Sequence, residues 1–392
     1  LDRALQAKPP MLGLSEIWSS RFVVLLILAA FISSATWLIL DSSRAWPVLL
    51  GVLVASCPCA LSLAIPTAMA AAQGTLTQLG LFVIHGRALE GLSKADTLVM
   101  DKTGTLTVGE PCLQTIVTLR SGYSENEVLQ IAAGMGEGQN HPFSLAIKQV
   151  IKKRNLAKKI FKKVSENHLG RGLSNESYRL GNANWVGVED LDHSENRQRS
   201  YIYLADEHGP IAELSFLDTP REGVDYLLEY AKNAGMSVFL LSGDTADTVK
   251  AWAQYHGIDR YQGGASPEDK FKFIKQLQEH GSTVCALGDG INDAPFLAKA
   301  NVSIAMGSGA PLAAAGADAV LMNPNLLVLV QAFKLSKRTQ RIIRQNLIWA
   351  FIYNITVIPV AIMAWINPWI AGIGMALSSL IVTLNAWRLR KV

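Results

Sequence analysis

The chain has 392 residues, which is more than one compact domain usually contains. Charged residues make up only 17% of it, and the formal net charge of +4 is too small to indicate nucleic-acid binding. The four cysteines do not have the density of a secreted disulfide framework.

Three uncharged stretches predict membrane helices, because a helix needs about 20 apolar residues to cross a bilayer. Residues 22–40, 45–86 and 345–387 contain no Asp, Glu, Lys or Arg. The last stretch is long enough for two spans, and Asn367-Pro368 divides it. Four spans in two hairpins are therefore predicted, at 22–40, 46–69, 345–366 and 369–387, with a short turn at 41–45. The alternative is that these segments are buried helices of a large soluble core.

Basic residues indicate how the spans are oriented. They precede the third span and follow the fourth, at Lys334, Lys337, Arg338, Arg341, Arg344, Arg388, Arg390 and Lys391. Basic residues next to spans favour the cytoplasmic side. Both ends of the chain and its large central region are therefore expected to face the cytoplasm.

The central region predicts an α/β fold. Short apolar strands are expected at 97–100, 237–241, 283–287, 302–306 and 319–322. Helical stretches are expected between the later strands, at 221–234, 245–256, 268–280 and 293–300. This alternation is typical of a doubly wound parallel sheet. The first strand lies far upstream of the others, so about 100 residues between them are predicted to form an inserted α+β domain.

The predicted domains follow from these elements. They are a cytoplasmic lead-in at 1–20, a transmembrane hairpin with a cytosolic helix extension at 21–95, the two parts of the α/β domain at 96–112 and 213–335, the inserted domain at 113–212, and a C-terminal transmembrane hairpin at 336–392.

Polar residues follow three of the predicted strands, and the carboxyl ends of parallel strands meet at one edge of a sheet. They are Asp101-Lys102-Thr103-Gly104-Thr105, Ser242-Gly243-Asp244 and the run from Gly288 to Asp293, with Lys270 on a helix between the last two. A carboxylate can accept a phosphoryl group. Mg²⁺ held by Asp289 and Asp293 would neutralise the phosphate charge, while Lys270 and Ser242 bind its oxygens. The alternative is that each fragment is a surface turn.

These motifs resemble the haloacid dehalogenase-like phosphotransferases, and in particular their P-type ATPase branch, which carries DKTGT (here 101–105) and GDGINDAP (here 288–295). The resemblance implies that Asp101 is the phosphorylated residue and also a Mg²⁺ ligand. It implies catalytic roles for Asp101, Lys102, Thr103, Ser242, Gly243, Asp244, Lys270 and Asn292. Simple phosphatases of this superfamily have a second Asp where Thr103 stands, so the acyl phosphate is expected to hydrolyse slowly.

Two weaker motifs in the predicted insert match the heavy-metal P-type ATPases. His141-Pro142 and Gly170-x-Gly172 resemble the pair that holds the adenine end of ATP in that family. Family members commonly have a Glu five residues before this His. Here Gly136 stands at that position and Glu137 is one residue away, which puts a role for Glu137 in doubt.

Cys57-Pro58-Cys59 lies in the second predicted span. Proline opens a helical turn, and two thiolates beside it form a soft site suited to Cu(I). The alternative is that the cysteines pack as small apolar residues. The spacing to Asp101 resembles the heavy-metal pumps, in which this motif carries the transported ion.

The predicted metal is Cu(I), with Ag(I) as a related cargo. Tyr353, Asn354, Met375, Ser378 and Ser379 resemble the Tyr-Asn and Met-x-x-Ser-Ser motifs of Cu(I) pumps, and no predicted span contains the Asp that is typical of Zn²⁺ and Cd²⁺ pumps. A Zn²⁺, Cd²⁺ or Pb²⁺ exporter is one alternative, and a membrane-tethered phosphatase without transport is another. LSLAIPTAMA and NPWIAGIGMALSSL resemble the branch that supplies copper for cbb3-type oxidase assembly.

The resemblance also implies the setting of the protein. It implies ATP and Mg²⁺ as cofactors, delivery of Cu(I) by a cytosolic copper chaperone, and a place in the bacterial inner membrane. The actuator domain of the family carries a Thr-Gly-Glu loop, which does not occur in these 392 residues. The chain is therefore expected to be the C-terminal part of a longer protein.

Overall fold

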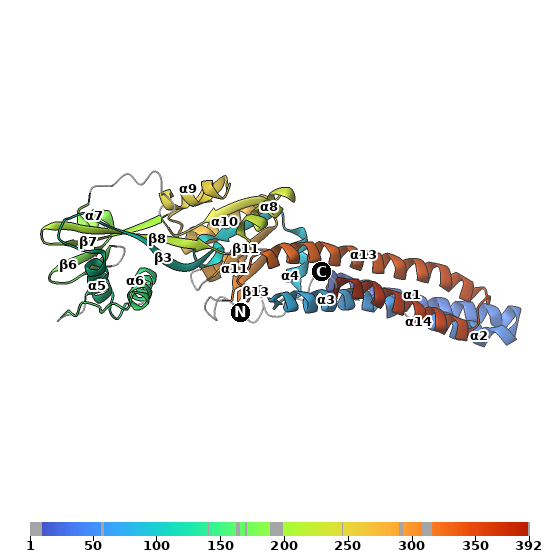
Figure 1. The fold of residues 1–392 in the computed structure, drawn as a ribbon. Helices are drawn as coiled ribbons and strands as arrows, with labels where there is room; N and C mark the ends of the chain where they lie inside the picture. The colour runs from blue at the N-terminus through green and yellow to red at the C-terminus, as the bar shows by residue number, and fades with distance from the viewer. Residues whose placement is uncertain are drawn as a thin grey trace.

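The computed structural model describes residues 10–55, 59–139, 141–161, 165–168, 171–188, 199–244, 246–289, 293–307 and 316–390, with the side chains of 10–23 and of Cys59 left out. The molecule is elongated, with a helix bundle at one end, a seven-stranded sheet in the middle and a six-stranded sheet at the other end (Figure 1).

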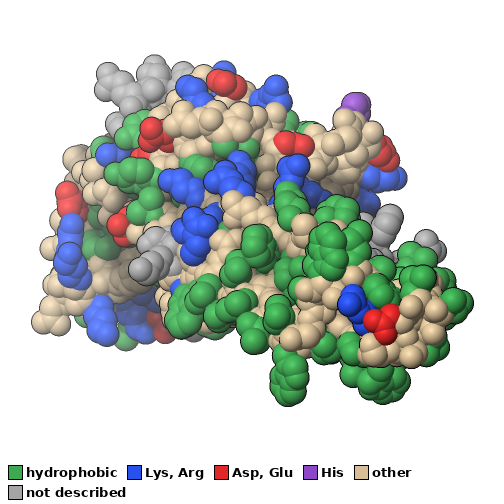
Figure 2. All heavy atoms as spheres, turned by 90° about the vertical axis from the view of Figure 1, so that its right-hand side faces the viewer, with side chains coloured by type: hydrophobic (Ala, Val, Ile, Leu, Met, Phe, Trp, Pro, Cys, Tyr) green, Lys and Arg blue, Asp and Glu red, His purple; other side chains and the backbone are tan. Residues whose placement is uncertain are grey.

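The helix bundle contains five helices. They are α1 (Pro10–Leu40), α2 (Ser42–Ala55), α3 (Cys59–Leu79), α13 (Leu327–Ile362) and α14 (Pro368–Trp387). Among the described residues, three segments are long and apolar enough to cross a membrane, Ser42–Leu79, Leu327–Ile362 and Pro368–Arg390, and Val24–Leu40 is a shorter apolar helix. Large apolar side chains such as Ile39 (88% exposed) and Trp369 (84%) cover the bundle surface (Figure 2). Such a surface is stable in lipid and unfavourable in water.

Two helix breaks differ in detail from the prediction. The turn expected at 41–45 is limited to Asp41, since the Asp41 carboxylate accepts a hydrogen bond from the Ser43 amide (3.1 Å) and α2 starts at Ser42. Helix α13 ends at Ile362, four residues before the predicted end of the third span. Asn367 caps α14 by accepting from the Ile370 amide (2.9 Å), and Pro368 occupies the first helical position.

The predicted parallel sheet is confirmed. Its strand order is β1 (Leu81–Val83), β13 (Ala319–Leu321), β12 (Val302–Met306), β11 (Val284–Gly288), β2 (Thr97–Asp101), β9 (Ser237–Leu241) and β10 (Arg260–Gln262). Every neighbouring pair is parallel except β1 with β13. The two edge strands β1 and β10 were not predicted. β1 lies in the stretch 21–95, which was predicted as a membrane hairpin with a helix extension, and β10 is largely polar, so it lacks the apolar pattern of a buried strand.

Helices cover both faces of this sheet. They are α4 (Arg87–Lys94), α8 (Val224–Asn233), α9 (Ala246–Tyr255), α10 (Pro267–Glu279) and α11 (Ala294–Lys299). Along β2, Leu98 and Met100 join the core formed with α4, α8, α9 and α13, while Val99 joins the core formed with α10 and α11. This alternation explains why every residue of β2 is buried.

The inserted region forms the second sheet, which is antiparallel throughout. Its strand order is β3 (Thr107–Thr118), β8 (Gly209–Pro220), β7 (Arg199–Asp206), β6 (Tyr178–Gly181), β5 (Gly172–Ser174) and β4 (Glu166–His168). Helices α5 (Glu125–Met135) and α6 (Pro142–Lys153) pack on it, and the short helix α7 (Ala183–Val186) lies beside β6 and β7. The predicted domain limits at 112/113 and 212/213 fall inside β3 and β8, which link the two sheets.

Candidate functional site

Asp101 ends β2, which lies between β11 and β9 in the middle of the seven-stranded sheet. Its side chain is buried, and the Lys270 ammonium donates to Asp101 Oδ1 (2.5 Å) and to Asp293 Oδ1 (2.8 Å). Lys270 lies in the first turn of α10, where Ser266 caps the helix. One buried cation therefore connects two buried carboxylates from different parts of the chain.

Three carboxylates gather at this point, with one oxygen each from Asp101, Asp289 and Asp293 within 4.8 Å of one another. Burial and the charge of Asp293 raise the pKa of Asp101 to about 7 and the pKa of Asp289 to about 6. Burial opposes the charged form of Lys270, but Asp101 and Asp293 raise its pKa above the usual value. The cluster therefore has more negative than positive charge, and its oxygen ligands match the preference of Mg²⁺.

The turn after Asp101, η1 (Lys102–Leu106), needs a glycine at its centre. Gly104 has a φ of +75°, and a Cβ atom at this position would collide with the Asp289 carboxylate. The Arg221 guanidinium donates to the Gly104 carbonyl (2.8 Å) and holds the turn in place. The close approach of this turn to Asp289 is what brings the ends of β2 and β11 into one site.

The end of β9 completes the site. Asp101 pairs in register with Leu241, so Ser242, Gly243 and Asp244 lie next to it. Asp244 forms an ion pair with Lys102 and accepts from the Thr103 hydroxyl (3.2 Å).

Ser242 directly follows β9, on the strand next to Asp101. Its Oγ accepts from the Asp244 amide (3.2 Å). Asn292 lies outside the described residues.

Two residues near the site, Asp218 and Arg221, were missed from the sequence. Asp218, at the end of β8, accepts from the Thr107 hydroxyl (2.6 Å) and from the Gly109 amide (3.2 Å), and Arg221 follows it. Through these contacts Asp218 and Arg221 hold the start of β3 against the end of β8, next to η1. The signal that was overlooked is an Asp and an Arg three residues apart, immediately after the mostly apolar stretch 211–217.

A second cavity lies in the six-stranded domain, with a volume of about 290 Å³. His141 and Gly172, both predicted from the sequence, line it. The lining also includes residues that were not predicted, among them Gln139, Phe143, His168, Arg171 and Tyr201. A Cβ atom at Gly172, whose φ is +148°, would collide with the backbone of β6. Partial burial lowers the pKa of His141, which favours a neutral imidazole. Gly170 lies outside the described residues.

Glu137 does not line this cavity. Its carboxylate pairs with the Lys158 ammonium (2.5 Å), which lowers the pKa of Glu137. His168 was missed because nothing in its local sequence marks it. Its ring hydrogen-bonds the Ser174 hydroxyl (2.8 Å) and lies 5.1 Å from the Trp185 ring. The cavity is therefore lined by aromatic, aliphatic and neutral polar groups and a single arginine.

The predicted membrane ligands lie on two packed helices. Tyr353 and Asn354 are on α13, and Met375 and Ser378 are on α14. Ser378 is buried and accepts from the Trp349 indole (3.1 Å). Within the described part of the chain, the Tyr353 hydroxyl and Asn354 Oδ1 are buried without a hydrogen-bond partner.

Cys57 lies outside the described residues, and Cys59 is described by its backbone alone. Cys59 begins α3, and the next residue, Ala60, packs with Ala350 and Val382 in one apolar cluster. Asn354 follows Ala350 by one helical turn, and Ser378 precedes Val382 by one turn. The start of α3 is thus next to the segments that carry Asn354 and Ser378.

A family model for haloacid dehalogenase-like hydrolases matches residues 95–301. Among curated proteins, the chain is 35% identical to a copper-exporting P-type ATPase of Mycobacterium tuberculosis and 33% identical to one of Staphylococcus aureus. It is also 36% identical to a cation-transporting P-type ATPase B of Mycobacterium tuberculosis. These alignments cover 100% of the chain and 50–54% of the relatives, so the chain spans about half the length of the curated relatives it matches.

Solved structures show the same arrangement. A zinc-transporting PIB-type ATPase in its E2.Pi state matches with a TM-score of 0.76 at 28% identity, over 94% of this chain and 62% of that one. The catalytic domain of a CPx-ATPase matches with a TM-score of 0.52 at 29% identity, over 67% of this chain and 98% of that one.

Proposed function

We propose that this chain, which belongs to the haloacid dehalogenase-like hydrolase family and to the heavy-metal P-type ATPases within it, is the catalytic part of an ATP-driven Cu(I) exporter. The observation that carries the proposal is the position of Asp101. It ends the interior strand β2, 2.5 Å from the Lys270 ammonium and beside two further carboxylates.

In the proposed reaction, Asp101 is the nucleophile. One of its carboxylate oxygens attacks the γ-phosphorus of ATP, and the bond to the bridging oxygen of ADP breaks. An aspartyl phosphate forms, and ADP leaves with the bond's electron pair. Lys270 is placed to offset the charge on the transferred group and to hold Asp293 in position. Mg²⁺, held by Asp101, Asp289 and Asp293, would supply further charge neutralisation when it is bound.

We assign the surrounding residues supporting roles. Lys102, Thr103 and Asp244 form a network that fixes the turn after the nucleophile. Ser242 and Gly243 directly follow β9, next to Asp101, and Asn292 is included from its motif in the sequence alone. Thr103 has no carboxylate to activate water, so the acyl phosphate is expected to persist long enough to drive a conformational cycle.

ATP is proposed to bridge the two sheets. The cavity lined by His141 and Gly172 would hold the adenine, since aromatic and neutral polar groups suit a base. The triphosphate would reach Asp101 when the six-stranded domain closes over the seven-stranded one. In these terms the six-stranded domain is the nucleotide-binding domain, and the seven-stranded domain is the phosphorylation domain.

The proposed cargo is Cu(I), held by Cys57, Cys59, Tyr353, Asn354, Met375 and Ser378. Two thiolates and a thioether are soft ligands, and no carboxylate lies in the uncharged stretches that would balance a divalent ion. The buried Tyr353 hydroxyl and Asn354 Oδ1, without partners among the described residues, are consistent with a ligand in this region. A zinc exporter is the second candidate, because a zinc-transporting relative has the same fold.

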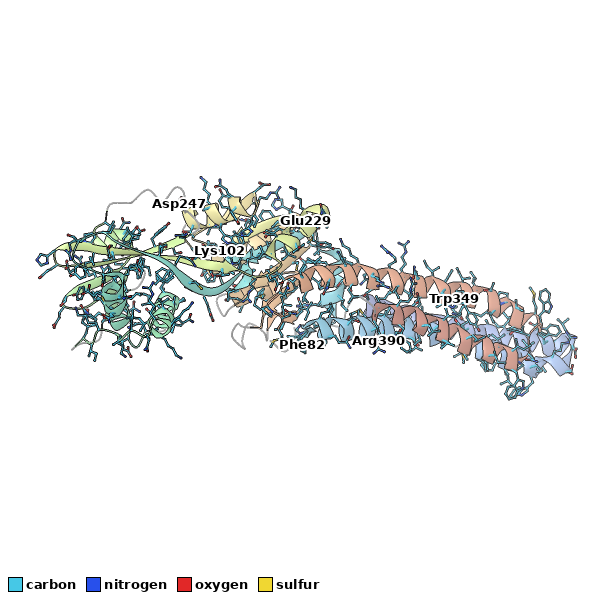
Figure 3. All side chains as sticks on the ribbon, viewed as in Figure 1. Phe82, Lys102, Glu229, Asp247, Trp349 and Arg390 are labelled. Atoms are coloured by element: carbon cyan, nitrogen blue, oxygen red, sulfur yellow. The ribbon has the colours of Figure 1, made fainter. Side chains whose placement is uncertain are left out.

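The nucleophile is tested by replacing it. Asp101→Asn keeps the size of the side chain and removes its nucleophilic charge. Incubation with γ-labelled ATP and Mg²⁺ should give an acid-stable, hydroxylamine-sensitive label on the unmodified chain and none on the variant. Asp247→Asn, which changes an exposed carboxylate on α9 (Figure 3), is the matched control and should label normally. Normal labelling of Asp101→Asn would exclude the assignment.

The cargo is tested separately. ATP hydrolysis by the full-length protein should be stimulated by Cu(I) and Ag(I) and not by Zn²⁺. Replacing Cys57 and Cys59 with Ser substitutes hard ligands for soft ones and should abolish the stimulation. Stimulation by Zn²⁺ alone would replace the copper assignment with the zinc one and leave the role of Asp101 intact.

A further inference from the structure

Helix α13 carries a row of basic residues where it leaves the phosphorylation domain. Lys334, Lys337, Arg338 and Arg341 have the spacing i, i+3, i+4 and i+7, which puts them on one side of the helix. Lys334, Lys337 and Arg341 are exposed and Arg338 is half-buried. The row ends four residues before the uncharged stretch 345–387 begins.

Two other elements close this row into a cavity of about 280 Å³, the basic pocket. Tyr230 of α8 forms one wall, and the ammonium groups of Lys334 and Lys337 each lie 5.9 Å from the centre of its ring. Arg388, in the turn η4 (Arg388–Arg390) after α14, forms another. Ile342 and Gln345 complete the lining. The pocket is therefore assembled from the phosphorylation domain and from both C-terminal membrane helices.

The lining of the basic pocket contains no acidic side chain to balance its charge. Five of its eight lining residues are Lys or Arg, and none is Asp or Glu. Among the described residues, no carboxylate pairs with Lys334, Lys337 or Arg341, although 15 ion pairs involve other residues of the chain. Like charges this close repel one another, so an external anion would bind favourably.

The pocket also lies at the level of the membrane surface. Figure 2, viewed from the bundle end, shows Lys and Arg side chains gathered where the apolar bundle meets the soluble part. Trp349 and Trp387, exposed to 40% and 56%, lie on the bundle side of this level, as interfacial tryptophans do. Arg341 precedes the uncharged stretch by four residues, or about 6 Å along the helix. The headgroup layer extends about 5–8 Å beyond the hydrocarbon core on each side, so Arg341 reaches it.

We propose that the basic pocket binds the phosphate-bearing headgroup of an anionic phospholipid from the cytoplasmic leaflet. Arg338, Arg341 and Arg388 donate to the phosphate oxygens, and the lysines reach the distal part of the headgroup. The bound lipid connects α8 of the phosphorylation domain to the membrane surface. This binding site does not depend on which metal is transported.

The test compares two double variants of the chain with equal charge. Lys337→Gln/Arg341→Gln removes two cations from the basic pocket. Arg344→Gln/Arg390→Gln removes two cations from the same membrane level outside its lining. Each protein is reconstituted in phosphatidylcholine nanodiscs containing phosphatidylglycerol and released into mild detergent. The phosphatidylglycerol that stays bound is then measured by native mass spectrometry.

The unmodified chain and the Arg344/Arg390 variant should retain phosphatidylglycerol. The Lys337/Arg341 variant should bind it roughly 30-fold more weakly, the effect of two basic groups near an anionic surface. All three proteins should unfold at similar temperatures. Equal loss of bound phosphatidylglycerol in both variants would show that general surface charge, and not the basic pocket, holds the lipid. Unchanged binding in the Lys337/Arg341 variant would exclude the basic pocket as the binding site. Displacement of the lipid by millimolar inorganic phosphate would show that the pocket takes a free anion instead.

Discussion

The two candidate sites of the soluble part, the carboxylate cluster around Asp101 and the cavity around His141, differ in charge. At the end of β2, four ionisable groups, those of Asp101, Asp289, Asp293 and Lys270, are largely buried within hydrogen-bonding or metal-binding distance. In the six-stranded domain, the cavity around His141 is lined by aromatic, aliphatic and neutral polar groups, with Arg171 as its one charged side chain among the described residues. Both sites would contact the same ATP molecule, the cluster at its triphosphate end and the cavity at its adenine end.

This difference indicates that the two sites have different roles in the proposed reaction. Buried charges act strongly on a phosphoryl group, because the low dielectric around them enhances electrostatic effects. Neutral aromatic walls contribute to affinity, and their effect is the same before and during the reaction. Changes at the carboxylate cluster around Asp101 should therefore abolish phosphoryl transfer. Changes at the cavity around His141 should only weaken ATP binding.

The largest effect is expected at Lys270. Lys270→Met keeps the length of the side chain and removes its charge, which leaves three carboxylates around the phosphate. The rate of phosphoenzyme formation at saturating ATP should fall by about 10²–10³-fold, the usual cost of losing a positioned electrostatic contact. It is measured by rapid quenching of γ-label incorporation.

Lys272→Met, on the exposed side of the same helix, is the control and should keep the normal rate. If Lys270→Met altered only the affinity for ATP, the division between chemistry and binding would be wrong.

A smaller effect is expected at Gly104. Gly104→Ala places a methyl group against the Asp289 carboxylate at a φ of +75°. Gly122→Ala has the same kind of conformational strain (φ +100°), but no atom lies within 4 Å of the added carbon. Both should lower the midpoint of thermal unfolding, each by the equivalent of about 1–3 kcal/mol.

Phosphorylation separates the two glycine variants. Only Gly104→Ala should also lose Mg²⁺-dependent labelling, because Asp289 must move to make room. Equal labelling of the two would mean that the contact between η1 and Asp289 has no catalytic importance.

The smallest effect is expected in the cavity around His141. His141→Ala should raise the Kd for ATP by about 5–10-fold, as the loss of one aromatic contact of about 1 kcal/mol implies. The maximal level of phosphoenzyme should not change. Glu137→Ala is the control, since its carboxylate pairs with Lys158 outside the cavity, and its Kd should stay within about twofold of normal. A fall in maximal labelling with His141→Ala would mean that the cavity around His141 also takes part in phosphoryl transfer.

Most of the parallel sheet could be predicted from local pattern. Strands such as 302–306 are short, apolar and bounded by polar residues, so their type and limits are clear. The links between the sheets were less clear, because β3 alternates between exposed and half-buried positions and the buried part of β8 is interrupted by Glu213 and Ser215. For the same reason Asp218 was overlooked, although it fastens the start of β3.

The sequence by itself determined the chemistry available to this protein. The order of residues alone indicates a carboxylate after a buried strand, together with a lysine and two more carboxylates at motif spacing. It also indicates two cysteines in an uncharged segment. Only the tertiary structure decided which of these groups meet. Lys270 contacts Asp101 across 169 positions of the chain, and Tyr230, Arg341 and Arg388 come together from three elements. Such contacts depend on strand order and helix packing, which bring distant residues together without leaving a local pattern in the sequence.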